Sequence, residues 1–105
     1  MMRLGGLILL CGLAASPALA GPDATRQGEL EHMVRQDCGS CHGMTLKGGL
    51  GSPLLPENLA GKDDDFLAAT ILDGRPGTAM PPWRGMLSDQ DVHWIVDYLK
   101  EGRRD

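Results

Sequence analysis

Two cysteines and a histidine stand close together at Cys38-Gly39-Ser40-Cys41-His42, and their spacing sets the chemistry open to this chain. The pattern Cys-x-x-Cys-His is the attachment signature of a c-type haem. On one helical turn, both sulfurs can reach the two vinyl groups of a porphyrin and form thioethers. The histidine that follows can direct a ring nitrogen at the iron, as proximal histidines do in haem proteins. We therefore predict one covalently bound haem, held by Cys38 and Cys41 and ligated by His42.

Two other interpretations of these residues are a redox-active disulfide and half of a zinc site. A redox Cys-x-x-Cys motif is expected near a βαβ pattern, and the sequence has no such pattern. A structural zinc site takes about four nitrogen and sulfur ligands, whereas only two cysteines remain after residue 20. The haem is therefore the favoured interpretation.

The first twenty residues have the pattern of a secretory signal peptide, with cleavage expected after Ala20. Arg3 supplies the positive start, Leu4 to Ala15 forms an apolar run, and Ala18-Leu19-Ala20 is a small-residue cleavage pattern. A membrane-spanning helix needs about 20 apolar residues, and this run is shorter. An uncleaved membrane anchor is therefore less favoured than a cleaved signal peptide. Cys11 lies within the run and is expected to be removed with it.

Residues 21–105 then form one domain of 85 residues, expected in the periplasm without stable membrane insertion. Nine basic and fourteen acidic residues give this part a net charge of −5. This balance argues against nucleic-acid binding, which needs a basic face. A chain of this size buries a limited core. A bound haem would supply the missing apolar mass, so we expect the protein to need its cofactor in order to fold. We also expect it to be a monomer.

Three helices must position the haem ligands. The first is predicted from Thr25 to Asp37, the second from Asp64 to Leu72, and the third begins after Ser88 and ends at Gly102. Their apolar stripes are, in chain order, Leu30, Met33 and Val34; Phe66, Leu67, Thr70 and Ile71; and Val92, Ile95, Val96 and Leu99. The first stripe leads straight into the cysteine motif.

Two long loops separate the helices. Glycines and prolines punctuate residues 43–61 and 74–86, and no segment alternates persuasively as a strand does. Asp63 or Asp64 is expected to cap the second helix, and Gly74 to end it. Long loops in compact domains are usually functional. The predicted class is therefore all-α, with loops that wrap around a haem.

Met80 is the strongest candidate for the second axial ligand. It precedes Pro81-Pro82, and a proline fixes its own φ and restricts the residue before it. The thioether is therefore aimed in a defined direction. Nearly forty residues separate Met80 from His42, enough to pass around a porphyrin edge. Met86 is the fallback, although it is expected to pack at the start of the last helix. The candidates excluded by their position or by predicted exposure are Met33, Met44, His32 and His93.

Three further residues are weaker candidates for cofactor binding. A backbone carbonyl near Pro53 could accept the Nδ1 proton of His42 and fix its ring; an ordinary loop proline is the alternative. The indole N–H of Trp83 and the guanidinium of Arg75 could bond the haem propionates. Alternatively, Trp83 packs against the porphyrin edge and Arg75 points into solvent.

The order helix, Cys-x-x-Cys-His, loop, helix, methionine and helix resembles the class I cytochromes c over essentially all of residues 24–101. This resemblance implies a fold of three main helices and long loops around one covalent haem. It also implies the haem contacts inferred above, with Met80 as distal ligand. In that family the first and last helices cross at a glycine and an aromatic residue. Gly28 with Tyr98 or Trp94 could serve here.

Two longer stretches, residues 37–54 and 71–83, look like the cytochrome c55X family, small periplasmic cytochromes of denitrifying bacteria encoded with cd1-type nitrite reductase. The resemblance implies a carrier of single electrons rather than an enzyme, placed between an upstream donor and that reductase. A role in maturing the d1 haem of the reductase is the alternative. A small haem enzyme with an open distal site is the third. The basic residues that could rim a brief docking contact are Lys47, Lys62, Arg75 and Arg84.

Overall fold

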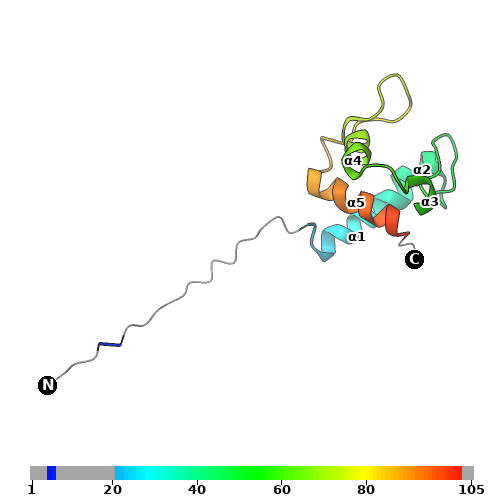
Figure 1. The fold of residues 1–105 in the computed structure, drawn as a ribbon. Coiled ribbons are helices and arrows are strands. Elements are labelled where there is room, and N and C mark those ends of the chain that lie inside the picture. The colour runs from blue at the N-terminus through cyan, green and yellow to red at the C-terminus, as the bar shows by residue number, and fades with distance from the viewer. Residues whose placement is uncertain (1–4, 7–20, 103–105) are drawn as a thin grey trace.

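The computed structural model describes residues 5–6 and 21–102, and this part of the chain is helical without strands (Figure 1). Apart from Gly5 and Gly6, the predicted signal peptide lies outside the described residues. The helices are α1 (Ala24–Met33), the π-helical turn η1 (Val34–Cys38), α2 (Gly39–His42), α3 (Pro56–Leu59), α4 (Asp64–Asp73) and α5 (Asp89–Glu101). The predicted all-α class is confirmed. Among the described helices, none combines the length and apolar character that crossing a bilayer requires.

One continuous helical path runs from α1 through η1 into α2, so the cysteine motif forms its last turns. Asp23 caps its start, because its carboxylate accepts a hydrogen bond from the backbone N–H of Arg26 at 2.8 Å. The helix predicted from Thr25 to Asp37 is confirmed, and it continues to His42. The wider π-helical turn ends at the first cysteine, Cys38. Such turns inside α-helices are frequent at functional sites.

The helix α4 begins at the predicted Asp64 and runs one residue beyond the predicted Leu72, with Asp63 and Gly74 as its caps. The carboxylate of Asp63 accepts a hydrogen bond from the N–H of Phe66 at 3.1 Å, and Gly74 ends the helix with φ of 68°. Its inward face differs from the prediction. Ala68 and Leu72 are buried in the core, whereas Phe66 is 62% exposed. The reason is that α4 divides its apolar residues between α5 on one side and a cavity on the other.

The central element is α5, which lies across α1 in Figure 1 and contacts α1, α3 and α4. All four residues of its predicted apolar stripe are buried. Ser88 caps it reciprocally, because the Ser88 hydroxyl accepts from the Asp91 N–H and the Asp91 carboxylate accepts from the Ser88 N–H. Gly102 ends it in a left-handed conformation. The rings of Trp94 and Tyr98 stack on α5 with centroids 5.1 Å apart.

An ion pair, not the predicted glycine, joins α1 to α5. Gly28 is exposed, and a Cβ built on it would meet no atom within 4 Å, so it does not lie at the helix crossing. Arg26 instead donates to the buried carboxylate of Asp91, with Nη2–Oδ2 at 2.9 Å and Nε–Oδ1 at 3.4 Å. The same guanidinium donates to the carbonyl of Met86 at 3.3 Å. This contact holds the chain just before α5 against α1.

Replacing Asp91 with asparagine is expected to lower the free energy of unfolding by about 2 kcal/mol at neutral pH, because the partly buried Arg26 loses its ionic partner. The hydrogen bonds from Arg26, more than any other cause, hold the pKa of Asp91 below its ordinary value. Because the pKa of Asp91 is lower in the folded than in the unfolded protein, its carboxylate stabilises the fold above about pH 4, the ordinary pKa of an aspartate. This stabilisation is lost as the pH falls from there through the lower pKa of the folded state. Denaturant unfolding of the haem-bound protein at several pH values measures the effect.

The matched control is Asp73→Asn, which breaks an exposed ion pair with Arg84. Such a surface pair contributes about 0.5 kcal/mol or less. Two results would contradict a stabilising Arg26–Asp91 ion pair. One is a loss of unfolding free energy in Asp91→Asn no larger than in Asp73→Asn. The other is a difference in unfolding free energy between Asp91→Asn and the wild type that does not become smaller in acid.

Candidate functional site

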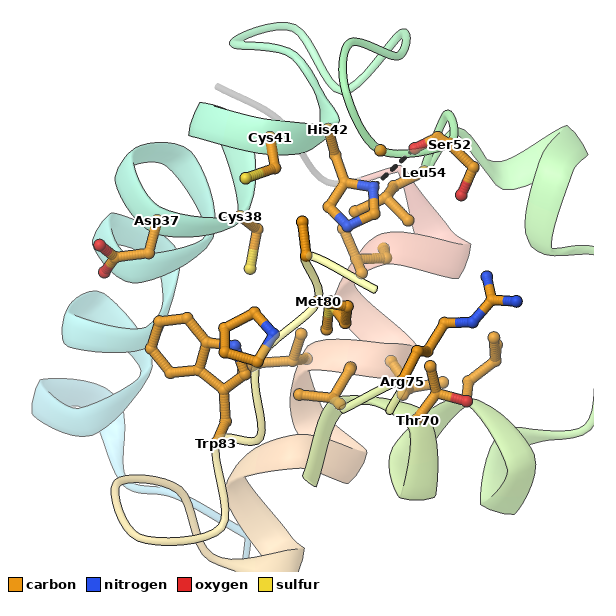
Figure 2. Close-up of a pocket in the computed structure, with 18 of the residues that line it drawn as sticks. Asp37, Cys38, Cys41, His42, Ser52, Leu54, Thr70, Arg75, Met80 and Trp83 are labelled. Atoms are coloured by element: carbon orange, nitrogen blue, oxygen red, sulfur yellow. Dashed lines mark hydrogen bonds between the residues drawn. The ribbon is translucent and has the colours of Figure 1, made fainter. Parts of the chain in front are cut away.

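A cavity of about 660 Å³ lies between the helical path that ends at His42 and the loop after α4 (Figure 2). This volume falls within the range of about 300–1,000 Å³ usual for ligand and cofactor pockets. The structure brings together on its wall all four residues predicted to attach or ligate a haem. These are Cys38, Cys41, His42 and Met80. Most of the remaining lining is apolar and comes from α4, α5 and the loops.

The two cysteines are free thiols on the helical path, and Figure 2 shows both sulfurs on the cavity side. Burial, with a smaller contribution from the charge of Asp37, raises the pKa of the Cys38 thiol to about 11. A redox-active Cys-x-x-Cys motif has a lowered thiol pKa instead. Within the described residues, no three histidine, cysteine or acidic side chains are grouped to hold a metal ion. The raised pKa of the Cys38 thiol therefore disfavours the redox-active disulfide.

The imidazole of His42 is oriented by the loop that follows α2. Its Nδ1 donates to the carbonyl of Ser52 at 2.6 Å (Figure 2). Because a carbonyl can only accept, Nδ1 carries a proton, and in the neutral imidazole the lone pair is then on Nε2, the nitrogen that can bind a metal. The carbonyl predicted near Pro53 is thus that of the preceding residue. Pro53 itself does not line the cavity.

A close approach at Gly51 makes this hydrogen bond possible. A Cβ built on Gly51 would lie 2.7 Å from Nδ1 and 2.8 Å from Cε1 of His42, closer than any side chain can stand. The N–H of Gly51 donates to the carbonyl of Cys41, and that of Gly48 donates to the carbonyl of His42, both at 2.8 Å. The loop is therefore folded back onto the end of α2. Its glycines predicted a loop, but not which of them touches the ring.

Met80 is presented by a loop whose backbone is fixed on both sides. The N–H of Arg75 donates to the carbonyl of Met80 at 3.1 Å. The hydroxyl of Thr78 accepts a hydrogen bond from the N–H of Met80 at 3.3 Å. A Cβ on Gly74 would lie 2.7 Å from the Met80 carbonyl, so only glycine fits where this loop leaves α4. Figure 2 shows Met80 on the side of the cavity away from α2.

The other candidate ligands do not compete with Met80. Met86 is 64% exposed and Met44 is 65% exposed, and neither lines the cavity. The prediction that Met86 packs at the start of the last helix is therefore wrong. His32 is exposed, and the predicted exposure of His93 is confirmed. Met33 lines the cavity, but from the same helical path that carries His42.

Trp83 and Arg75 both line the cavity, on the side opposite His42 (Figure 2). Trp83 is half-buried and Arg75 is exposed, so both can reach a group at the cavity edge. The basic residues predicted to rim a docking contact divide into two pairs. Lys62 lines the cavity together with Arg75. Arg84 is instead bound to a carboxylate of α4 at 2.7 Å, and Lys47 lies away from the lining.

The donor set fits a covalently bound haem. Two free thiols face the cavity, an imidazole bound through Nδ1 leaves its Nε2 available to a ligand, and a thioether approaches from the other side. These groups lie on the helical path that ends at His42 and on the loop that follows α4. This arrangement is that of a small c-type cytochrome.

Known proteins agree with this class. A profile of the family described as cytochrome C oxidase, cbb3-type, subunit III matches residues 17–99. Cytochrome c55X of Paracoccus denitrificans (strain Pd 1222) is 58% identical over 94 residues, which cover 89% of this chain and 91% of that protein. The solved structure of a c-type cytochrome NirC superimposes with a TM-score of 0.77 at 58% identity, covering 78% of this chain and 96% of that one. The chain belongs to this family of c-type cytochromes and, within it, to the cytochromes c55X.

Membership implies covalently attached haem c, and small c-type cytochromes of this kind are usually electron carriers. The chain also resembles a small part of a larger protein. Dihydro-heme d1 dehydrogenase of Pseudomonas aeruginosa is 37% identical over 90 residues, which cover 86% of this chain and 18% of that enzyme.

Proposed function

We propose that this protein carries single electrons in the periplasm by means of one haem c held in the cavity. Cys38 and Cys41 would each add their S–H across one vinyl group to form a thioether. Nε2 of His42 and the thioether of Met80 would be the two axial ligands. When bound, the haem supplies one-electron chemistry between ferrous and ferric iron. The observation that carries the proposal is the placement of these four side chains around one largely apolar cavity.

The remaining residues set the properties of such a site. The hydrogen bond from His42 to the Ser52 carbonyl fixes the ring and would make it a stronger electron donor to a bound iron. Methionine as the second ligand raises the reduction potential. If His42 and Met80 both held the iron, they would leave it no open position for a substrate, which favours a carrier over a small haem enzyme. Arg75 and Trp83 would hold the propionates at the cavity edge.

The proposal includes export and a single domain. The pattern of residues 1–20 supports a signal peptide cleaved after Ala20. Residues 21–105 would then be a monomeric monohaem domain in the periplasm, where c-type haems are attached to exported chains.

We propose cd1-type nitrite reductase as the electron acceptor. The 58% identity to cytochrome c55X of a denitrifying Paracoccus supports this partner. The mouth of the cavity supports a brief docking contact there. Leu50 is 92% exposed and Phe66 is 62% exposed, and both line the cavity beside Lys62 and Arg75. An apolar centre with basic neighbours suits a partner surface that carries carboxylates.

Charge reversal in Lys62→Glu is expected to slow electron transfer from the reduced protein to purified cd1-type nitrite reductase by about tenfold at low ionic strength. The difference should shrink as salt screens the encounter. Stopped-flow mixing at several salt concentrations measures the rate. Lys47→Glu is the matched control, because Lys47 does not line the cavity. Equal slowing in both variants would contradict docking at the mouth, and no transfer from the wild type would remove the reductase as acceptor.

A second candidate function is maturation of the d1 haem. The likeness to part of dihydro-heme d1 dehydrogenase favours it. Deleting the gene from its host separates the two candidates. Slower nitrite turnover with a normal d1 haem content in the reductase would support the carrier and overturn maturation. Loss of d1 haem from the reductase would support maturation instead.

A further inference from the structure

Residues 74–80 close on themselves before they deliver Met80 to the cavity. Pro76-Gly77 occupies the centre of a turn in which the N–H of Thr78 donates to the carbonyl of Arg75 at 3.0 Å. The glycine has φ of 80°, as a type II turn requires at this position. The N–H of Arg75 then donates to the carbonyl of Met80 at 3.1 Å, so the two ends of the loop are joined.

The hydroxyl of Thr78 links this turn to Met80. It donates to the carbonyl of Arg75 at 2.6 Å and accepts from the N–H of Met80 at 3.3 Å. No backbone N–H further along the chain can replace that of Met80 in this link. Pro81 and Pro82 have no N–H, so Met80 supplies the only backbone donor of these three residues. The next donor, the N–H of Trp83, is already bonded to carbonyls at the end of α4.

We propose that Thr78 is the positioning residue for Met80, and that its hydroxyl holds the Met80 backbone where the thioether meets the iron. This inference rests on the proposed ligation by Met80. Without the hydroxyl, the turn still closes through its backbone, but the N–H of Met80 loses its acceptor. Met80 can then swing away from the cavity more easily. Because Thr78 is exposed, the change should show in ligand exchange more than in stability.

The test uses the ferric haem-bound protein and imidazole as a competing ligand. Thr78→Val keeps the shape of the side chain and removes the hydroxyl, whereas Thr78→Ser keeps the hydroxyl. Titration is followed by loss of the weak far-red absorption band of methionine-ligated ferric haem. We expect Thr78→Val to bind imidazole about fivefold to tenfold more tightly than the wild type, the effect of one or two lost hydrogen bonds. Thr78→Ser should stay close to the wild type.

The matched control is Thr25→Val, the same change on the exposed side of α1 and away from the cavity. It should leave imidazole binding unchanged. Wild-type affinity in Thr78→Val would overturn the inference. Equal tightening in Thr78→Val and Thr78→Ser would overturn it too, because the hydroxyl would then not be the cause.

Met80→Ala separates this inference from the ligand assignment on which it rests. If the far-red band survives that substitution, Met80 is not the ligand and both proposals fall. If the band is lost there while Thr78→Val matches the wild type, Met80 is the ligand and only the role of Thr78 falls.

Discussion

The Met80→Ala protein, with haem attached, is expected to lose the far-red band of the ferric form and to bind carbon monoxide readily once reduced. The substitution removes the thioether that would close the second axial position, and the loop around it supplies no other ligand. The reduction potential should fall on the order of 0.2 V, a part of the roughly 0.8 V that axial ligands span. Visible spectra of both oxidation states, carbon monoxide titration and potentiometry measure these changes.

Met86→Ala is the matched control for this experiment. Met86 lies six residues further on, is 64% exposed and does not line the cavity, so its loss should leave spectrum and potential unchanged. A far-red band that persists in Met80→Ala, or that is lost in Met86→Ala, would contradict the assignment. Ready binding of carbon monoxide by the wild type would mean an open distal position, and a small haem enzyme would then become the better interpretation.

The parts of the fold that follow from local sequence were predictable. Each main helix has a capping residue at its start and an apolar stripe, and these are interactions within a few residues. Asp63 and Ser88 therefore predicted the starts of α4 and α5 correctly. The haem motif is local in the same sense, because its two thiols and imidazole lie within five consecutive residues. Met80 was singled out by its two neighbouring prolines.

Contacts between distant parts of the chain were not predictable. Arg26 and Asp91 are 65 residues apart, and neither position carries a pattern that announces the pair. Gly28 has the residue type of a close helix crossing but an open surface around it. Phe66 belongs to an apolar stripe and yet is largely exposed, because its side of α4 faces the cavity rather than the core. Which carbonyl orients His42 was also a matter of loop geometry, and it proved to be that of Ser52.

That loop geometry leads to a second large expected effect, at Gly51. Any side chain there must displace the imidazole, because a Cβ would stand 2.7 Å from Nδ1 and 2.8 Å from Cε1 of His42. The alternative is to move the loop, which would break the hydrogen bond of 2.6 Å from His42 to the Ser52 carbonyl. Either movement separates the ring from its acceptor. The methyl group thus acts on the proposed proximal ligand without touching the iron.

Gly51→Ala is expected to lower the free energy of unfolding of the haem-bound protein by about 2–4 kcal/mol, through overpacking and the lost hydrogen bond. Its reduction potential should rise, because an imidazole without that acceptor is a poorer donor to ferric iron. Denaturant unfolding and potentiometry measure the two effects. Gly28→Ala is the matched control, since Gly28 is helical with open space around it; it should keep the wild-type potential and gain up to about 1 kcal/mol. If Gly51→Ala kept both stability and potential, the loop would not be what holds His42, and the orientation of the ring would have to come from the helix alone.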